Sequence, residues 1–108
     1  AAGGIVSTAV NLARFYAALL AGQLLAPAQL QELKTMVSET EQYGLGIERR
    51  RAPCAYVWGH GGAVPGYRTL AFSSEEGSRQ AIVMVNISIA SSVLGQRFSA
   101  AIVSALCR

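Results

Sequence analysis

The sequence predicts an α+β fold in which helices pack against an antiparallel sheet. Two patterns support this class. Apolar residues recur every three or four positions near both ends of the chain, whereas the middle has extended, glycine-containing segments with turn residues between them. The length of 108 residues suits a single domain. We therefore expect the order helix, helix, three or four antiparallel strands, helix.

Two amphipathic helices in tandem are expected at the N-terminal side. Ser7 and Thr8 can cap the first helix, and Gly22 can end it. Pro27 suits the first turn of the second helix, and a polar connection over residues 38–42 follows. The apolar stripe of the first helix consists of Leu12, Phe15, Tyr16, Leu19 and Leu20, and that of the second consists of Leu30, Leu33, Met36 and Val37.

Four extended segments are expected next. They cover residues 43–51, 56–60, 67–73 and 79–87, with a break at 52–54, a turn at 64–66 and a hairpin loop at 74–77. The last strand contains Ala81-Ile82-Val83-Met84-Val85, which is apolar on both faces. Such a strand is typical of the middle of a sheet covered on both sides, which needs more helices than this chain supplies. A C-terminal helix has the stripe Leu94, Phe98, Ile102, Ala105 and Leu106.

Composition narrows the function classes. Hydrophobic residues make up 52% and charged residues 14% of the chain, which excludes disorder, and the apolar runs are too short for a membrane helix. The net charge of +3 comes without the basic, aromatic stripe of nucleic-acid-binding proteins, so no nucleic-acid partner is expected. Because polar residues are scarce for a domain of this size, we expect a missing part of a larger protein to cover an apolar face.

The two cysteines, Cys54 and Cys107, leave two interpretations open. Either they form a disulfide that fixes the C-terminus to the rest of the fold, or they are two unrelated buried thiols. With His60 as the only histidine, they are too few for a zinc site, so no metal or other cofactor is expected. The chain has no aspartate, which excludes a self-contained Ser/His/Asp triad unless a glutamate substitutes.

His60 stands at the end of a predicted strand and is followed by Gly61-Gly62-Ala63. Glycines let a substrate lie against the backbone, and the amide that follows can stabilise an oxyanion. The alternative is a structural histidine beside a glycine-rich turn. The arginines at residues 49–51 bind a carboxylate or keep a strand edge from aggregating, and Arg50 is expected on the opposite strand face from its neighbours.

Six short segments resemble a known family. In chain order they are Gly3-Gly4-Ile5-Val6-Ser7-Thr8, Leu12-Ala13-Arg14-Phe15, Gly22-Gln23-Leu24-Leu25, Tyr43-Gly44-Leu45-Gly46, Gly59-His60-Gly61-Gly62 and Pro65-Gly66-Tyr67. Their order and spacing resemble the C-terminal part of the penicillin-recognising serine hydrolases, in particular secreted D-alanyl-D-alanine carboxypeptidases with class C β-lactamase-like folds. The resemblance covers essentially the whole chain.

This resemblance implies that residues 1–108 are the C-terminal segment of a single β-lactamase/DD-peptidase-like domain. The family uses Ser-x-x-Lys, a Tyr-x-Asn or Ser-x-Asn element, and Lys-Thr-Gly or His-x-Gly on an edge strand. Only the third motif is present here, as His60-Gly61-Gly62. We therefore expect the nucleophile and general base to lie in a missing N-terminal part of the same enzyme, and the segment alone to be inactive.

The resemblance also implies roles for the matching residues. His60 supports the general base and the substrate, and the N–H of Ala63 is an oxyanion donor. Arg49 faces the C-terminal carboxylate of a peptide, and Gly61 and Gly62 bind substrate along the strand. Gly61 replaces the hydroxylated residue common at its position. An esterase or β-lactamase of the same fold is therefore an alternative activity, and a non-catalytic binding fragment is another.

The positions of Cys54 and Cys107 are similar to those of the disulfide in these secreted enzymes. The resemblance therefore implies a bridge between them and a secreted or cell-envelope location. For the complete protein it implies a serine-type D-Ala-D-Ala carboxypeptidase-like hydrolase. Its substrates are expected to be peptidoglycan-type peptides, or β-lactams and esters.

Overall fold

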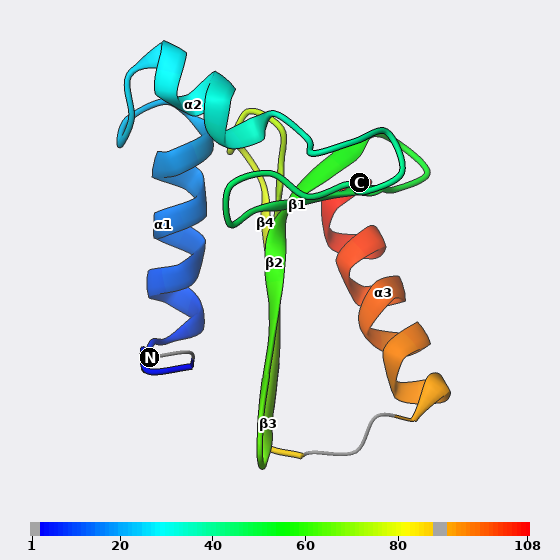
Figure 1. Cartoon of the computed structure of the whole chain (residues 1–108). Helices are drawn as coiled ribbons and strands as arrows, with labels where there is room; N and C mark the ends of the chain where they lie inside the picture. Colours follow the sequence, from blue (N-terminus) through cyan, green and yellow to red (C-terminus); the bar gives the residue numbers. More distant parts are fainter. Residues whose placement is uncertain (1–2, 88–90) are drawn as a thin grey trace.

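A computed structural model describes residues 3–87 and 91–108 of the chain (Figure 1). The elements in order are α1 (Ala9–Leu20), α2 (Pro27–Lys34), β1 (Glu48–Arg51), β2 (Tyr56–Val64), β3 (Tyr67–Ser74), β4 (Gln80–Val85) and α3 (Ser92–Leu106). The strands form one antiparallel sheet in the order β1-β2-β3-β4. The predicted α+β class and the predicted order of elements are confirmed.

Helices α1 and α3 cover opposite faces of the sheet, so the molecule has three layers (Figure 1). Each face has its own hydrophobic core. The core on the α1 side consists of Tyr16, Leu19, Leu20, Ile47, Trp58 and Ala71. The core on the α3 side consists of Ala52, Val57, Phe72, Ala81, Ile102 and Leu106. No helix within residues 3–87 and 91–108 is long and apolar enough to cross a membrane.

The first helix begins as predicted, but the second is shorter than its apolar stripe. The side chain of Thr8 accepts a hydrogen bond from the N–H of Asn11 and so caps α1. Helix α2 ends at Lys34, because Thr35 is extended and its hydroxyl donates to the carbonyl of Gln31. The last two positions of the predicted stripe therefore lie beyond the helix.

The strand predicted over residues 43–51 begins only at Glu48. Before it, the N–H of Gly44 donates to the carbonyl of Ile47 at 2.8 Å, and Gly46 has φ +76°. That backbone conformation suits glycine and is incompatible with an extended strand. Tyr43 retains one bridge to Glu48. Alternating glycine and apolar residues thus imitated a strand where the chain makes a tight turn.

The strand that contains His60 is longer than predicted. It continues to Val64 and stays paired with β3, from Val57 opposite Ser74 to Val64 opposite Tyr67. A two-residue turn joins the two strands. His60 therefore lies inside a strand and not at its end, because pairing with β3 overrides the weak strand preference of the glycines.

The apolar strand β4 is an edge strand of the described sheet, not a middle one. Its two faces are covered by α1 and α3, which this chain itself provides. Apolar residues on both faces of a strand indicate that both faces are covered. They do not indicate whether further strands pair with its two edges. The prediction of a central position for residues 79–87 is therefore wrong for this chain.

Candidate active site at the open edge of β2

The outer edge of β2 is only partly covered. β1 pairs with four residues of β2, so residues 60–64 extend beyond the last pair. The N–H of Gly61 points away from β3, since it donates to Oε1 of Glu48 at 3.0 Å. Backbone N–H groups alternate in direction along a strand, so the N–H of the exposed Ala63 points to the same edge. The predicted oxyanion donor therefore lies on a solvent-facing edge.

The glycines of β2 serve different purposes. A Cβ on Gly59 would lie 1.9 Å from the carbonyl oxygen of Ala71, so only glycine lets β2 and β3 approach this closely. A Cβ on Gly61 would lie 3.2 Å from the side chain of Leu70, which is a tight contact. A Cβ on Gly62 would meet no atom within 4 Å. Gly62 therefore leaves open space beside the edge, where another molecule can approach the backbone.

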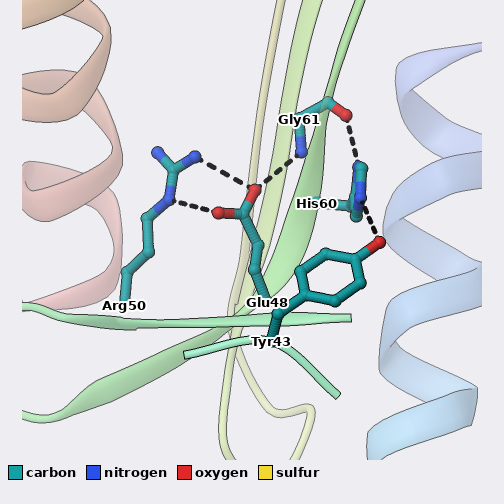
Figure 2. A network of polar contacts seen from close by, with 5 residues as sticks. All are labelled: Tyr43, Glu48, Arg50, His60 and Gly61. Atoms are coloured by element: carbon teal, nitrogen blue, oxygen red, sulfur yellow. Dashed lines mark hydrogen bonds and ion pairs between the residues drawn. The ribbon is translucent and has the colours of Figure 1, made fainter. Parts of the chain in front are cut away.

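Glu48 and Arg50 form a salt bridge at this edge (Figure 2). Nε and Nη2 of Arg50 each donate to one carboxylate oxygen of Glu48 at 3.0 Å. Both side chains come from β1 two residues apart, so they project from the same face of the strand. The side chain of Glu48 is 22% exposed and that of Arg50 is 43% exposed. The carboxylate is thus held between a guanidinium group and the N–H of Gly61.

His60 is held by two polar contacts on the other side of the strand (Figure 2). Nδ1 contacts the carbonyl oxygen of Gly61, an atom that only accepts hydrogen bonds, so Nδ1 carries a proton. In the neutral ring Nε2 is then the acceptor, and the hydroxyl of Tyr43 donates to it at 2.8 Å. The turn before β1 positions Tyr43, whose side chain stays accessible to solvent. In the hydrogen-bonded pair of Tyr43 and His60, Tyr43 is therefore the residue that is more exposed to solvent.

Tyr16 of α1 is buried in the hydrophobic core on the α1 side of the sheet. Burial raises the pKa of the Tyr16 phenol above its ordinary value, and nearby Glu48 and Tyr43 raise this pKa further. A phenol with a raised pKa stays neutral at physiological pH. Tyr16 thus adds no negative charge near Glu48 and Tyr43.

The structure does not bring Arg49 to the open edge. Nε of Arg49 donates to Oε1 of Gln42 at 2.7 Å, and the guanidinium group lies 4.5 Å from the centre of the Tyr56 ring. Arg50 projects to the opposite face, as predicted, where it lies 4.4 Å from the centre of the Phe72 ring. Of the two arginines, Arg50 is therefore the one beside the glycines of β2.

A groove of about 480 Å³ lies between α3 and the face of the sheet formed by the ends of β2 and β3. Its walls include the backbone of residues 61–63 and the side chains of Arg50 and Arg68. Gly95, Phe98 and Ser99 of α3 line the other side. The groove therefore brings the glycine-containing end of β2, two arginines and Phe98 onto a single concave surface.

A disulfide joins Cys54 to Cys107, with the two Cα atoms 5.5 Å apart. It links the loop between β1 and β2 to the residue that follows α3. This finding decides between the two interpretations of the cysteines in favour of a bridge. Among the described residues, no three His, Cys, Asp or Glu side chains group together as a metal site.

The Beta-lactamase family model matches residues 1–102. The chain belongs to the β-lactamase family of penicillin-recognising serine hydrolases. The helices and the four-stranded antiparallel sheet of this β-lactamase-family chain form the α+β fold of its structural neighbours.

Two solved structures resemble this β-lactamase-family chain. A D-stereospecific amidohydrolase from Streptomyces sp. has 33% sequence identity and a TM-score of 0.77, and the match covers 89% of this chain and 29% of that one. A D-amino acid amidase from Ochrobactrum anthropi SV3, complexed with D-phenylalanine, has 25% identity and a TM-score of 0.68, with coverage of 88% and 34%. The chain thus spans about a third of the length of each of these hydrolases.

Two residues of the candidate site, Tyr43 and Glu48, were not predicted from the sequence. Of the three arginines considered there, Arg49 was expected in the role of Arg50. Tyr43 and Glu48 contact β2 from the turn and strand before it, and Arg50 contacts Glu48. Tyr43 stood in one of the recognised segments, Tyr43-Gly44-Leu45-Gly46, and a turn assigned to these glycines would have placed it beside β2. No comparable local signal distinguishes Glu48 from an ordinary polar strand residue.

Proposed function

We propose that this chain forms the sheet-edge side of the active site of a serine acyl-transfer hydrolase that acts on D-amino acid amides or peptides. The observation that supports this best is the N–H of Ala63, which points outward from an exposed strand beyond the last β1–β2 pair. An N–H fixed on a strand can stabilise the oxyanion of an acyl-transfer intermediate. The adjoining groove offers room for a substrate beside this donor.

The nucleophile in this proposal comes from outside the chain, because no serine here is followed three residues later by lysine. Its oxygen attacks the substrate carbonyl carbon, and the oxyanion accepts hydrogen bonds from the N–H of Ala63 and from the nucleophile's own N–H. Collapse breaks the C–N bond, and the amine leaves with a proton. Water then hydrolyses the acyl-serine and releases the acid.

His60 acts in this proposal as a positioning residue. Its ring is held by the carbonyl of Gly61, and its Nε2 accepts a hydrogen bond from the hydroxyl of Tyr43. This hydrogen bond holds the hydroxyl oxygen of Tyr43 in one orientation at the edge of the site. The hydroxyl is suited to steady the proton that passes from the nucleophile to the leaving amine.

The substrate class is supported by the two structural neighbours, whose names describe a D-stereospecific amidohydrolase and a D-amino acid amidase. A D-Ala-D-Ala carboxypeptidase acting on peptidoglycan-type peptides is the second candidate. It is favoured by Arg68, since a guanidinium group opposite Ala63 can bind a terminal carboxylate. Esters and β-lactams undergo the same acyl transfer. The disulfide favours a secreted or cell-envelope location for the whole enzyme.

The test uses the full-length protein that contains this chain and a chromogenic anilide of a D-amino acid, with the L-anilide as the stereochemical control. Ala63→Pro removes the outward N–H and should lower kcat by about 10²- to 10³-fold. Ala63→Gly keeps the N–H and should stay within a few-fold of the wild type. Equal effects of the two variants contradict the role of Ala63. Absence of turnover by the wild-type protein favours the non-catalytic binding fragment.

A further inference from the structure

Glu48 occupies the place at the open edge where a bound carboxylate would have good partners. Its Oε1 accepts the outward N–H of Gly61 at 3.0 Å, and its two oxygens accept both donors that Arg50 directs toward β2. A bidentate guanidinium and a backbone N–H are the groups that bind carboxylates strongly. The protein's own side chain therefore satisfies these groups.

The carboxylate of Glu48 lies directly beside the backbone of residue 61. A Cβ built on Gly61 would lie 3.7 Å from Oε1 of Glu48 and 3.2 Å from Leu70. The Glu48 side chain is mostly covered, so water only partly screens its charge. A second carboxylate placed here would meet a negative charge and a guanidinium that is already paired.

We propose that Glu48 is a specificity-determining residue that shields Arg50 and selects against leaving groups with a free carboxylate. This rests on the proposed function and deepens it. Amides and esters whose leaving group is uncharged are accepted, whereas peptides that end in a free carboxylate next to the cleaved bond are disfavoured. Arg68, which lies opposite Ala63 in the β2–β3 register, is the competing anion binder.

The test compares two peptides that differ in one group. Both contain an acylated D-Ala-D-Ala unit, one with a free terminal carboxylate and the other with a terminal carboxamide. For the full-length wild-type protein, kcat/KM should be higher for the carboxamide. Glu48→Gln keeps the size and one acceptor oxygen but removes the charge. In this variant, kcat/KM for the carboxylate peptide relative to the carboxamide peptide should rise by about tenfold or more. This gain is expected because the substrate carboxylate can then form a charge-assisted pair with Arg50.

Three variants separate specificity from structure. Glu48→Asp retains the negative charge and should stay within about threefold of the wild-type ratio. The double variant Glu48→Gln/Arg50→Gln should lose the gain, because the released guanidinium is then absent. Glu75→Gln is the matched control, since Glu75 pairs with Lys34 at 3.1 Å and is exposed. It should leave the ratio unchanged.

An unchanged ratio in Glu48→Gln, or a wild-type preference for the carboxylate peptide, overturns the role of Glu48 and assigns carboxylate binding to Arg68. If Glu48→Gln fails to fold, inhibition of the wild-type protein decides the same point. Free D-alanine should then inhibit carboxamide hydrolysis about tenfold more weakly than D-alaninamide, and the reverse order contradicts the proposal. Absence of turnover of both peptides by wild type refutes the proposed function itself.

Discussion

The hydroxyl of Tyr43 donates a hydrogen bond to Nε2 of His60 across 2.8 Å and 17 residues of sequence. The rings also meet edge to face, with centroids 5.5 Å apart. His60 is therefore oriented by an element outside its own hairpin. A change in Tyr43 should affect the site without disturbing the β2–β3 pairing.

We expect Tyr43→Phe to lower kcat of the full-length enzyme about 3- to 10-fold with little change in KM, because a single hydrogen bond is lost near the reacting centre. His60→Gln in the Tyr43→Phe background should add little, since the two residues act together. Steady-state kinetics on the D-anilide measure both effects. Tyr67→Phe is the control, because Tyr67 is exposed on β3. Additive losses would show that Tyr43 and His60 act independently.

Tyr16 should titrate at higher pH than a tyrosine in the unfolded chain, because burial raises its pKa. The chain has 4 tyrosines, so a titration of phenolate absorbance should show one late component that is absent from Tyr16→Phe. The unfolded state releases this proton before the folded state does. The contribution of Tyr16 to the free energy of unfolding is therefore complete below about pH 10 and is lost as pH rises through the folded pKa. Identical titrations of wild type and Tyr16→Phe would contradict this.

Gly59→Ala should destabilise the protein by about 3 kcal/mol or more, because the new Cβ would collide with the backbone of β3. Gly62→Ala adds the same methyl group at a position with open space and should change the free energy of unfolding by about 0.5 kcal/mol or less. Urea denaturation of both variants measures the difference. If substrate lies against Gly62, this variant should still lose kcat/KM. Similar stabilities for the two variants would mean that β2 and β3 are not so closely spaced.

Removal of the disulfide should cost about 4 kcal/mol of unfolding free energy by the chain-entropy model, since the bridge closes a loop between cysteines 53 positions apart. Cys54→Ser/Cys107→Ser and chemical reduction should give the same loss in urea denaturation. Ser104→Ala, an exposed change on α3, serves as the control. Two alkylated cysteines in the non-reduced protein would show that the bridge is absent.

The helices could be predicted from sequence because their signals are local. The cap at Thr8 and the stripe that contains Tyr16 and Leu19 act within one helix, and the structure confirms α1 from Ala9 to Leu20. The length of β2 could not be predicted in this way. Its last residues are held by pairing with β3, which strand preferences of single glycines do not reveal.

The sequence predicted only those residues of the candidate site that are neighbours in one short segment. The run His60 to Ala63 stood out because a histidine and two glycines are neighbours in sequence. The partners Glu48 and Tyr43 reach this run only because the chain turns at Gly46 and because β1 stops pairing at Gly59. Both conditions depend on backbone geometry between separate elements, so neither appears as a spacing of residue types.

Two consecutive residues of β2 make their polar contacts on opposite sides of the sheet. His60 meets Tyr43 on the α1 side, whereas Gly61 meets Glu48 on the α3 side (Figure 2). Under the proposed function, natural variation can therefore alter the choice of leaving group on the α3 side while the Tyr43–His60 pair remains intact. An insertion of one residue within β2, between Val57 and His60, would exchange the faces of His60 and Gly61 and disrupt both contacts at once. This segment should accordingly evolve by substitution and tolerate no change in length.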